Sequence, residues 1–291
     1  MNHTETSRDL LKDAVDVHVH TAPDIFERRL NDVEAAQQAK DAELKAIVIK
    51  NHVTMTADRA QLATTLTNFS VFGGIVLNYS VGGLNWHAVQ MAIGFGAKEI
   101  WMPTINAENY MKKPTISQFT KVLPRGLNGI CLLNEKNELV PEVEPILNLI
   151  AEHDLILASG HISVEEAKVL VEKARAIGVK KILVTHPQID FIDCQIEDMK
   201  QLVKKGAILE HCYDTITPHM THPVASSTIF SAIKAIGAEH CIMSSDGGQK
   251  QNPSPTEMLR LFIQEMLTLG LHEGEIKIMI KENPAKLLNI K

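Results

Sequence analysis

Two histidines one residue apart, His18 and His20, lie in the stretch DVHVHTAPD at residues 16–24. An apolar segment precedes them and a Pro-Asp pair follows, as expected where a strand ends in a turn. Residues i and i+2 of a strand project from the same face, so both imidazoles can reach one cation. Histidine is the commonest metal ligand, and two buried rings without a partner would be unfavourable. The pair therefore predicts a metal site.

Three further potential ligands, His161, His186 and Asp246, each follow a short apolar stretch in the same way. Imidazole and carboxylate ligands suit Zn, Mn, Fe, Co or Ni, and geometry decides among these metals. A bound metal ion brings the pKa of its water near neutrality, and a neighbouring carboxylate can accept the proton. Any single histidine here could instead be an ordinary core or surface residue, but the ordered set favours a metal site.

Lys50 follows four apolar residues in AIVIKNHV and shares its strand face with His52. A lysine there could be carboxylated and bridge two metals, could hold a substrate carboxylate, or could extend its amine to solvent. Arg28 and Arg29, in APDIFERRLND, could bind a carboxylate or phosphate, or could be solvated loop charges. We take Lys50 as a candidate catalytic residue, and His52, Arg28 and Arg29 as candidate substrate ligands.

Eight short apolar segments rich in β-branched residues indicate buried parallel strands. They span residues 14–20, 44–52, 70–78, 99–106, 155–161, 181–187, 207–213 and 241–247. Helix-like segments alternate with them, and several begin at Ser, Thr or Asp and end at Gly. The alternation predicts an α/β protein with the (β/α)8 TIM-barrel fold, whose active site lies at the carboxyl ends of the strands. The candidate metal ligands, Lys50 and His52 fall at such ends.

The irregular interval between the fourth and fifth strands predicts a small hairpin insertion near residues 128–141. The tail GEIKIMIKENPAKLL predicts a closing helix, a break at proline and a short last helix. We expect residues 1–291 to form a single barrel domain. A doubly wound open sheet is the main rival, but it would carry a Gly-rich loop after the first strand, where this chain has HVHTAPD.

The ordered ligand set resembles that of the amidohydrolase superfamily of metal-dependent barrel enzymes. The resemblance rests on HVH at 18–20, on His161, His186 and Asp246, and on ENPAKLL, which is similar to the superfamily's Asn-Pro-Ala closing segment. Within the superfamily the chain resembles an uncharacterised branch. By this resemblance both histidines of HVH bind the metal with His161, His186 or both. Asp246 binds it too, acts as the general base, or does both.

Two-metal members of that superfamily usually carry a bridging group on the fourth strand, often a carboxylated lysine. This chain has EIWMPTINAENY there, with no Lys or Glu at the strand end and Glu108 two residues further on. Lys50 could take over the bridge and hold a second ion. Without a bridge, a one-metal site leaves His186 for acid–base work, as in the decarboxylase branch. We therefore expect one or two divalent ions per chain, with zinc favoured.

The formal net charge of -6 lacks the basic character of a nucleic-acid binder. The four cysteines are far apart and form no C-x-x-C pair, which is typical of reduced thiols in a cytoplasmic protein. No apolar run approaches the roughly 18–20 residues of a membrane helix. We expect a cytoplasmic protein that acts on a small molecule, without a nucleic-acid or membrane partner. Superfamily members often self-associate, which leaves a homo-oligomer open.

The leading function is hydrolysis of a small, anionic substrate at an amide, ester or lactone bond by a metal-activated water. A one-metal decarboxylase or lyase of the same superfamily is the first alternative, and loss of CO₂ would distinguish it. A non-catalytic ligand-binding barrel is the second alternative, which the missing bridge keeps open. Asp246 argues against that barrel, because a binding module has little use for a water-activating carboxylate.

Overall fold

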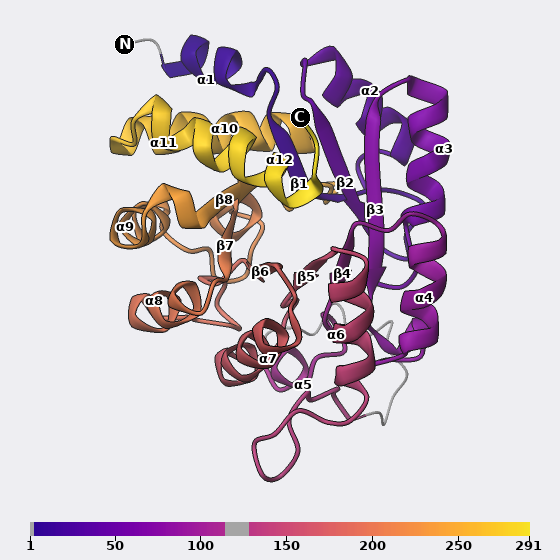
Figure 1. Ribbon diagram of the computed structural model, residues 1–291. Helices are drawn as coiled ribbons and strands as arrows, with labels where there is room; N and C mark the ends of the chain where they lie inside the picture. Colours follow the sequence, from indigo (N-terminus) through magenta and orange to yellow (C-terminus); the bar gives the residue numbers. More distant parts are fainter. Residues whose placement is uncertain (1–2, 114–127) are drawn as a thin grey trace.

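The computed structural model describes residues 3–113 and 128–291. Eight parallel strands lie side by side in sequence order (Figure 1). They are β1 (Val15–His20), β2 (Ala46–Lys50), β3 (Ser70–Val76), β4 (Glu99–Trp101), β5 (Ile156–Ala158), β6 (Lys181–Thr185), β7 (Ile208–Cys212) and β8 (Cys241–Ser244). Val19 and Gly247 pair in parallel, which brings the two outer strands together. The predicted (β/α)8 TIM barrel is confirmed.

The helices lie outside the strands (Figure 1). The main ones are α1 (His3–Leu11), α2 (Asp32–Asp41), α3 (Ala57–Thr67), α4 (Trp86–Gly94), α5 (Glu108–Met111), α6 (Val143–Glu152), α7 (Val164–Ile177), α8 (Ile196–Lys204), α9 (Ser226–Ile236), α10 (Pro255–Leu269), α11 (Glu273–Lys277) and α12 (Asn283–Leu288). Short 3-10 turns are η1 (Tyr79–Val81), η2 (Tyr213–Ile216) and η3 (Ala238–His240). Reciprocal capping boxes start α2 and α7. No helix in the described ranges is long and apolar enough to span a membrane.

Two segments outside the regular alternation can be compared with their predictions. Leu133 and Leu139 form an antiparallel bridge within the expected hairpin insertion. At the C-terminus a π-helical turn, η4 (Ile278–Glu282), joins α11 to α12, so the expected break is wrong. Pro284 falls in the first turn of α12, where a proline is tolerated.

Two apolar clusters hold the barrel together. The larger packs the helices against the outer face of the strands. The smaller fills the barrel interior with Val15, Val17, Ala46, Val48, Val76, Trp101, Ile156, Ala158, Leu183, Ile242, Leu287 and Leu288. Branched side chains from alternate strand positions are typical of a packed barrel centre. Beyond this cluster, toward the carboxyl ends of the strands, the buried side chains become polar.

Candidate metal centre

Asp246 connects the two histidines of the HVH motif. Its Oδ1 lies 3.0 Å from His18 Nε2 and 3.0 Å from His20 Nε2. All three side chains are buried. Three of the five side chains expected from the sequence to bind a metal thus meet at one carboxylate oxygen, where β8 meets β1.

A β-bulge in β1 helps to place these histidines. Asp16 pairs with Ile47 and Val19 with Ile49, so β1 has one residue more than β2 between the two pairs. The Asp16 Oδ1 accepts hydrogen bonds from the amides of His18 at 3.2 Å and Ser245 at 3.1 Å. Bulges re-aim side chains and are common beside active sites. Through Asp16, the bulge in β1 is hydrogen-bonded to the residue that follows β8.

Glu210 fixes the other edge of the His18 ring. Its Oε1 lies 3.1 Å from His18 Nδ1 and accepts a hydrogen bond from Ser244 Oγ at 2.7 Å. A carboxylate on one ring nitrogen orients the other toward a metal and makes it a better ligand. The neighbouring His211 faces the other way, with Nδ1 3.0 Å from Gln188 Oε1. Of the adjacent Glu210 and His211, the glutamate therefore belongs to the site.

Lys50 is fully buried. Its Nζ lies 2.9 Å from His18 Nε2 and 5.4 Å from the centre of the Trp101 ring. Burial lowers the pKa of this amine, while the carboxylates of Asp246 and Glu210 oppose that shift. The amine is directed into the cluster and does not extend to solvent.

The remaining predicted histidines complete a continuous group of rings. His52 stacks on His20 with ring centres 4.8 Å apart, and its Nδ1 lies 2.9 Å from Thr104 Oγ1. His161 lies 5.9 Å from His52 and 5.0 Å from His186, between ring centres. Burial lowers the pKa of His52 and His161, and lowers that of His186 to about 4. These rings are neutral at pH 7, which is the form that binds metals.

His18 differs from the other rings in its charge. Burial lowers its pKa, but the Asp246 and Glu210 carboxylates outweigh burial and raise it to about 9. In the metal-free protein this ring is therefore protonated at neutral pH. A cation that binds Nε2 has to displace the proton, as metal binding to histidine generally does.

The donor set fits a divalent cation. Asp246 Oδ1 and the Nε2 atoms of His18 and His20 supply three donor atoms. In addition, the buried Nδ1 atoms of His161 and His186 have no hydrogen-bond partner among the described residues. Buried polar atoms are rarely left without a partner, so such atoms at a cluster of histidines indicate a missing ligand partner. One condition follows from Lys50: its amine has to withdraw from His18 Nε2 when that nitrogen binds a metal.

Two of the candidate residues have unusual backbone conformations. His186 has φ +31° and Asp246 has φ +49°, in the left-handed region that non-glycine residues seldom adopt. Such conformations persist only where surrounding contacts enforce them, and they concentrate at functional sites. His186 directly follows β6 and Asp246 is the second residue after β8, so both lie at the mouth of the barrel.

The two loop arginines have different surroundings. Arg28 donates from Nε to Asp24 Oδ2 at 2.7 Å, and its side chain is 5% exposed. Arg29 donates from Nη1 to the carbonyls of Lys250 at 3.3 Å and Asn252 at 3.0 Å. Arg29 thus holds two loops together, whereas Arg28 lies buried beside the histidines.

Two polar residues near the cluster were not identified from the sequence. Glu99, at the start of β4, is fully buried, and neither carboxylate oxygen has a hydrogen-bond partner among the described residues. Burial, and then the charge of Glu210, raises its pKa well above the usual range. Cys212 Sγ lies 3.9 Å from His18 Nδ1 and forms, with His18 and Asp246, a group whose ligand atoms lie within 4.8 Å of one another. A signal for Glu99 was available, because it shares the interior strand face with Trp101.

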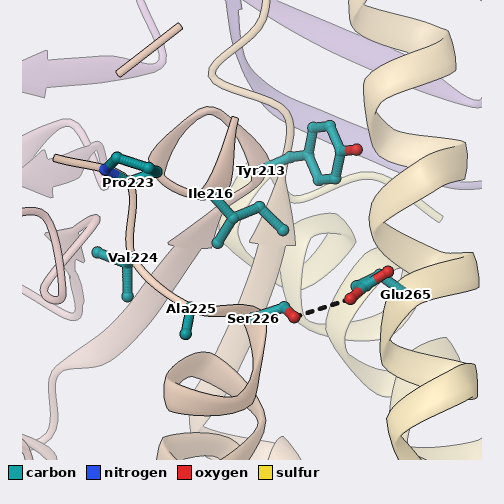
Figure 2. A pocket seen from close by; sticks show the side chains of 7 residues that line it. All are labelled: Tyr213, Ile216, Pro223, Val224, Ala225, Ser226 and Glu265. Carbon is teal, nitrogen blue, oxygen red and sulfur yellow. Dashed lines mark hydrogen bonds between the residues drawn. The ribbon is translucent and has the colours of Figure 1, made fainter. Parts of the chain in front are cut away.

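Figure 2 shows a separate pocket, whose lining includes none of the candidate histidines. It is lined by Tyr213, Ile216, Pro223, Val224, Ala225, Ser226 and Glu265. Ser226 Oγ donates to Glu265 Oε1 at 2.7 Å across it. None of the candidate site residues lines this pocket, so it contributes nothing to the metal centre.

Comparison with solved structures supports the fold. An amidohydrolase from Pseudomonas aeruginosa aligns with TM-score 0.66 and 9% identity over 99% of this chain and 98% of that chain. An organophosphorus hydrolase from Deinococcus radiodurans aligns with TM-score 0.60 and 12% identity over 94% and 92%. YJJV, a TATD homolog from Escherichia coli K12, aligns with TM-score 0.60 and 13% identity over 97% and 100%. The expected resemblance to the amidohydrolase superfamily is thus confirmed at the level of the fold.

Sequence comparison gives a family without an assigned activity. No curated protein matches the chain. A family model described as a family of unknown function, DUF6282, matches residues 13–210, which is more than half of the chain. The matched range includes His18, His20, His161 and His186.

Proposed function

The chain belongs to this family, and we propose that it is a metal-dependent hydrolase of a small, anionic molecule with an amide, ester or lactone bond. One observation carries the proposal: Asp246 Oδ1 lies 3.0 Å from the Nε2 atoms of both His18 and His20. Two imidazoles and a carboxylate at the carboxyl ends of barrel strands are the groups that bind and use a catalytic divalent ion.

In this proposal His18, His20, His161 and Asp246 hold the ion, and His186 stays free of it. Zinc is our choice, because neutral imidazole and carboxylate groups suit it. When bound, such an ion lowers the pKa of water to near neutrality and polarises a carbonyl group.

The side chains divide the remaining work. Asp246 accepts the proton of the attacking water, since its carboxylate lies at the barrel mouth and burial keeps the surroundings dry. Neutral His186 exchanges a proton with the leaving atom of the substrate. Glu210 holds His18 in the tautomer and orientation that expose Nε2.

We assign one ion per chain and a cationic role to Lys50. Its amine lies 2.9 Å from His18 Nε2 and is surrounded by the charges of Asp246, Glu210 and Glu99. When His18 Nε2 binds the ion, the amine withdraws from that nitrogen, and as an ammonium group in the same pocket it can stabilise an anionic substrate. A carboxylated Lys50 that bridges two ions is the alternative.

A one-metal decarboxylase or lyase is the second candidate function. It is favoured by the position of Lys50, whose amine lies at the proposed metal ligand His18 where a two-metal site would have a bridging carboxylate. Release of CO₂ from a carboxylic acid, without uptake of water into the product, would identify it.

The first experiment is metal analysis of protein grown with added zinc and bicarbonate. Wild type is compared with the double variant His18→Ala/His20→Ala and with His240→Ala, an exposed histidine in η3. We expect one ion per chain in wild type and in His240→Ala, and loss of the ion in the double variant. A wild type without metal, or a double variant with unchanged metal content, would contradict the proposal. Metal-loaded protein is then assayed with amides, esters and lactones.

A further inference from the structure

Arg28 lies in the loop between β1 and α2, and this loop is fixed in place. Arg28 forms an antiparallel bridge with Gln249, and the Arg29 amide donates to the Gly248 carbonyl at 2.9 Å. The partner segment directly follows Asp246. The backbone that carries Arg28 is therefore held against the loop that carries the catalytic carboxylate.

The Arg28 guanidinium has one edge in use and one free. Nε donates to Asp24 Oδ2 at 2.7 Å, and the Asp24 side chain is 0% exposed. Nη2 is buried and has no hydrogen-bond partner among the described residues. Buried guanidinium N–H groups nearly always have an acceptor. Within residues 3–113 and 128–291 this Nη2 atom lacks an acceptor, and a bound ligand could supply one.

The free edge belongs to the same mouth as the metal ligands. Arg28 Cζ lies 5.7 Å from the centre of the Phe26 ring, and Phe26 meets His52 edge-on at 6.2 Å. His52 in turn stacks on His20. After burial, the positive charge of Arg28 is the next largest cause that lowers the pKa of His20. The guanidinium is thus within electrostatic reach of a proposed metal ligand.

We propose that Arg28 binds a carboxylate group of the substrate, beside His20 and His52, and so sets the specificity of the site for monocarboxylates. The inference rests on the proposed function, because it concerns the same site. A free guanidinium edge offers parallel N–H groups that match the two oxygens of a carboxylate. Asp24 offsets the single positive charge of Arg28, so the second negative charge of a phosphate finds no counter-charge at this pair, and a singly charged carboxylate is the better ligand for its free N–H groups.

The neighbouring arginine does not share this role. Its guanidinium is directed to the carbonyls of Lys250 and Asn252. Arg29 maintains the loop, and Arg28 contacts the ligand. Two adjacent residues of the same type therefore have separate tasks, and only the surroundings distinguish them.

The test measures binding by calorimetry with benzoate, its neutral analogue benzamide, and inorganic phosphate. The proteins are wild type, Arg28→Gln, Arg28→Lys and Lys250→Gln, which removes an exposed charge near the same mouth. We expect wild type and Lys250→Gln to bind benzoate more tightly than benzamide. Arg28→Gln should lose benzoate affinity by about tenfold or more and keep its benzamide affinity, although it should unfold at a lower temperature because the buried Asp24 carboxylate loses its ion partner. Arg28→Lys should retain part of the affinity.

Equal affinity of wild type for benzoate and benzamide, including no measurable binding of either, would overturn the inference. Benzoate binding that Arg28→Gln leaves intact would also overturn it, as would Arg28-dependent binding of phosphate tighter than that of benzoate. Each titration is run with metal-loaded and metal-free protein. If wild type binds no metal, the proposed hydrolase function is wrong. Arg28-dependent benzoate binding in metal-free protein would still support the carboxylate site.

Discussion

The barrel mouth has two walls of different character. On one, formed by β7, β8, β1 and β2, Asp246 and Lys50 both contact the His18 ring. On the other, at the ends of β3 and β4, Asn78 and Asn106 take the places where charged ligands stand elsewhere. We call these the charged wall and the neutral wall.

Hydrogen bonding separates the walls more clearly than charge. Asn78 Nδ2 donates to the His52 carbonyl and to Thr104 Oγ1, and its Oδ1 accepts from the amides of Thr104 and Asn106. These bonds use the full capacity of the amide. Thr104 Oγ1 also contacts His52 Nδ1. The neutral wall is therefore a completed support for the loop that holds His52.

The charged wall is incomplete by the same measure. His20 Nδ1 and Glu210 Oε2 are buried and have no hydrogen-bond partner within residues 3–113 and 128–291. Full satisfaction indicates a structural role, and unsatisfied buried donors and acceptors indicate a place for a ligand. The comparison teaches that only one side of this barrel mouth is built for chemistry.

The largest effect is expected from Asp246→Asn. A neutral amide loses the charge that both histidines face, so metal affinity should fall by at least about 100-fold, beyond the range for supporting residues. Hydrolysis should become undetectable. Competition with a chelator measures the affinity, and Glu239→Gln, a largely exposed side chain, serves as the control. Unchanged metal content in Asp246→Asn would show that Asp246 is not a metal ligand.

Glu210→Gln should have the next largest effect. The amide cannot orient and polarise His18 as the carboxylate does, so metal affinity should fall by about 10- to 100-fold. The same competition assay applies. An affinity equal to that of wild type would mean that the Glu210–His18 contact does not act on the metal site.

Metal affinity should also depend on pH in a definite direction. The carboxylates raise the pKa of His18 from its ordinary 6.5 to about 9 in the metal-free protein, so the ring is protonated below pH 9. Binding requires the neutral ring, and the affinity should fall about tenfold for each pH unit below that value. Titration in weakly buffered solution should release a proton at pH 8. No proton release would show that the cation does not bind His18.

Asn78→Ala tests the neutral wall. Removing a fully bonded amide leaves buried groups of Thr104, Asn106 and His52 without partners, and should lower the free energy of unfolding by about 1–3 kcal/mol. Denaturant unfolding measures this loss. Metal affinity should change far less than in Glu210→Gln. A loss of metal as large as in that variant would erase the distinction between the walls.

Cys212→Ser should have the smallest effect on the metal. The sulfur lies 3.9 Å from His18 Nδ1, but Glu210 already contacts that nitrogen at 3.1 Å. We therefore expect unchanged metal content and affinity. Loss of the metal in this variant would place the cation on the Nδ1 side of His18, away from His20.

The sequence was sufficient for the fold and for the neighbourhood of the candidate residues. Apolar runs located all eight strands, and the ends of parallel strands necessarily meet, so His18, His161 and Asp246 could be grouped in advance. Period-two reasoning also placed His18 and His20 together. These predictions depend only on local patterns and on the topology of the barrel.

Other details depend on contacts between distant segments. The bulge at Asp16 relies on the Ser245 amide, 229 positions away, and no local pattern indicates it. Which of Glu210 and His211 faces inward depends on the register of β7, which alternation alone leaves open. Glu99 was overlooked because it stands at the start of its strand, where barrel sites are not expected.

The seam between β1 and β8 has a consequence for how the protein is made. The His20 amide donates to the Gly247 carbonyl at 2.7 Å, joining the first strand of the barrel to the loop after its last strand. A nascent chain carries both histidines of the HVH motif long before Asp246 leaves the ribosome, and contacts of such long sequence separation form slowly. No partly built barrel can assemble the ligand set. Metal uptake by this ligand set therefore reports that β8 has closed the barrel against β1.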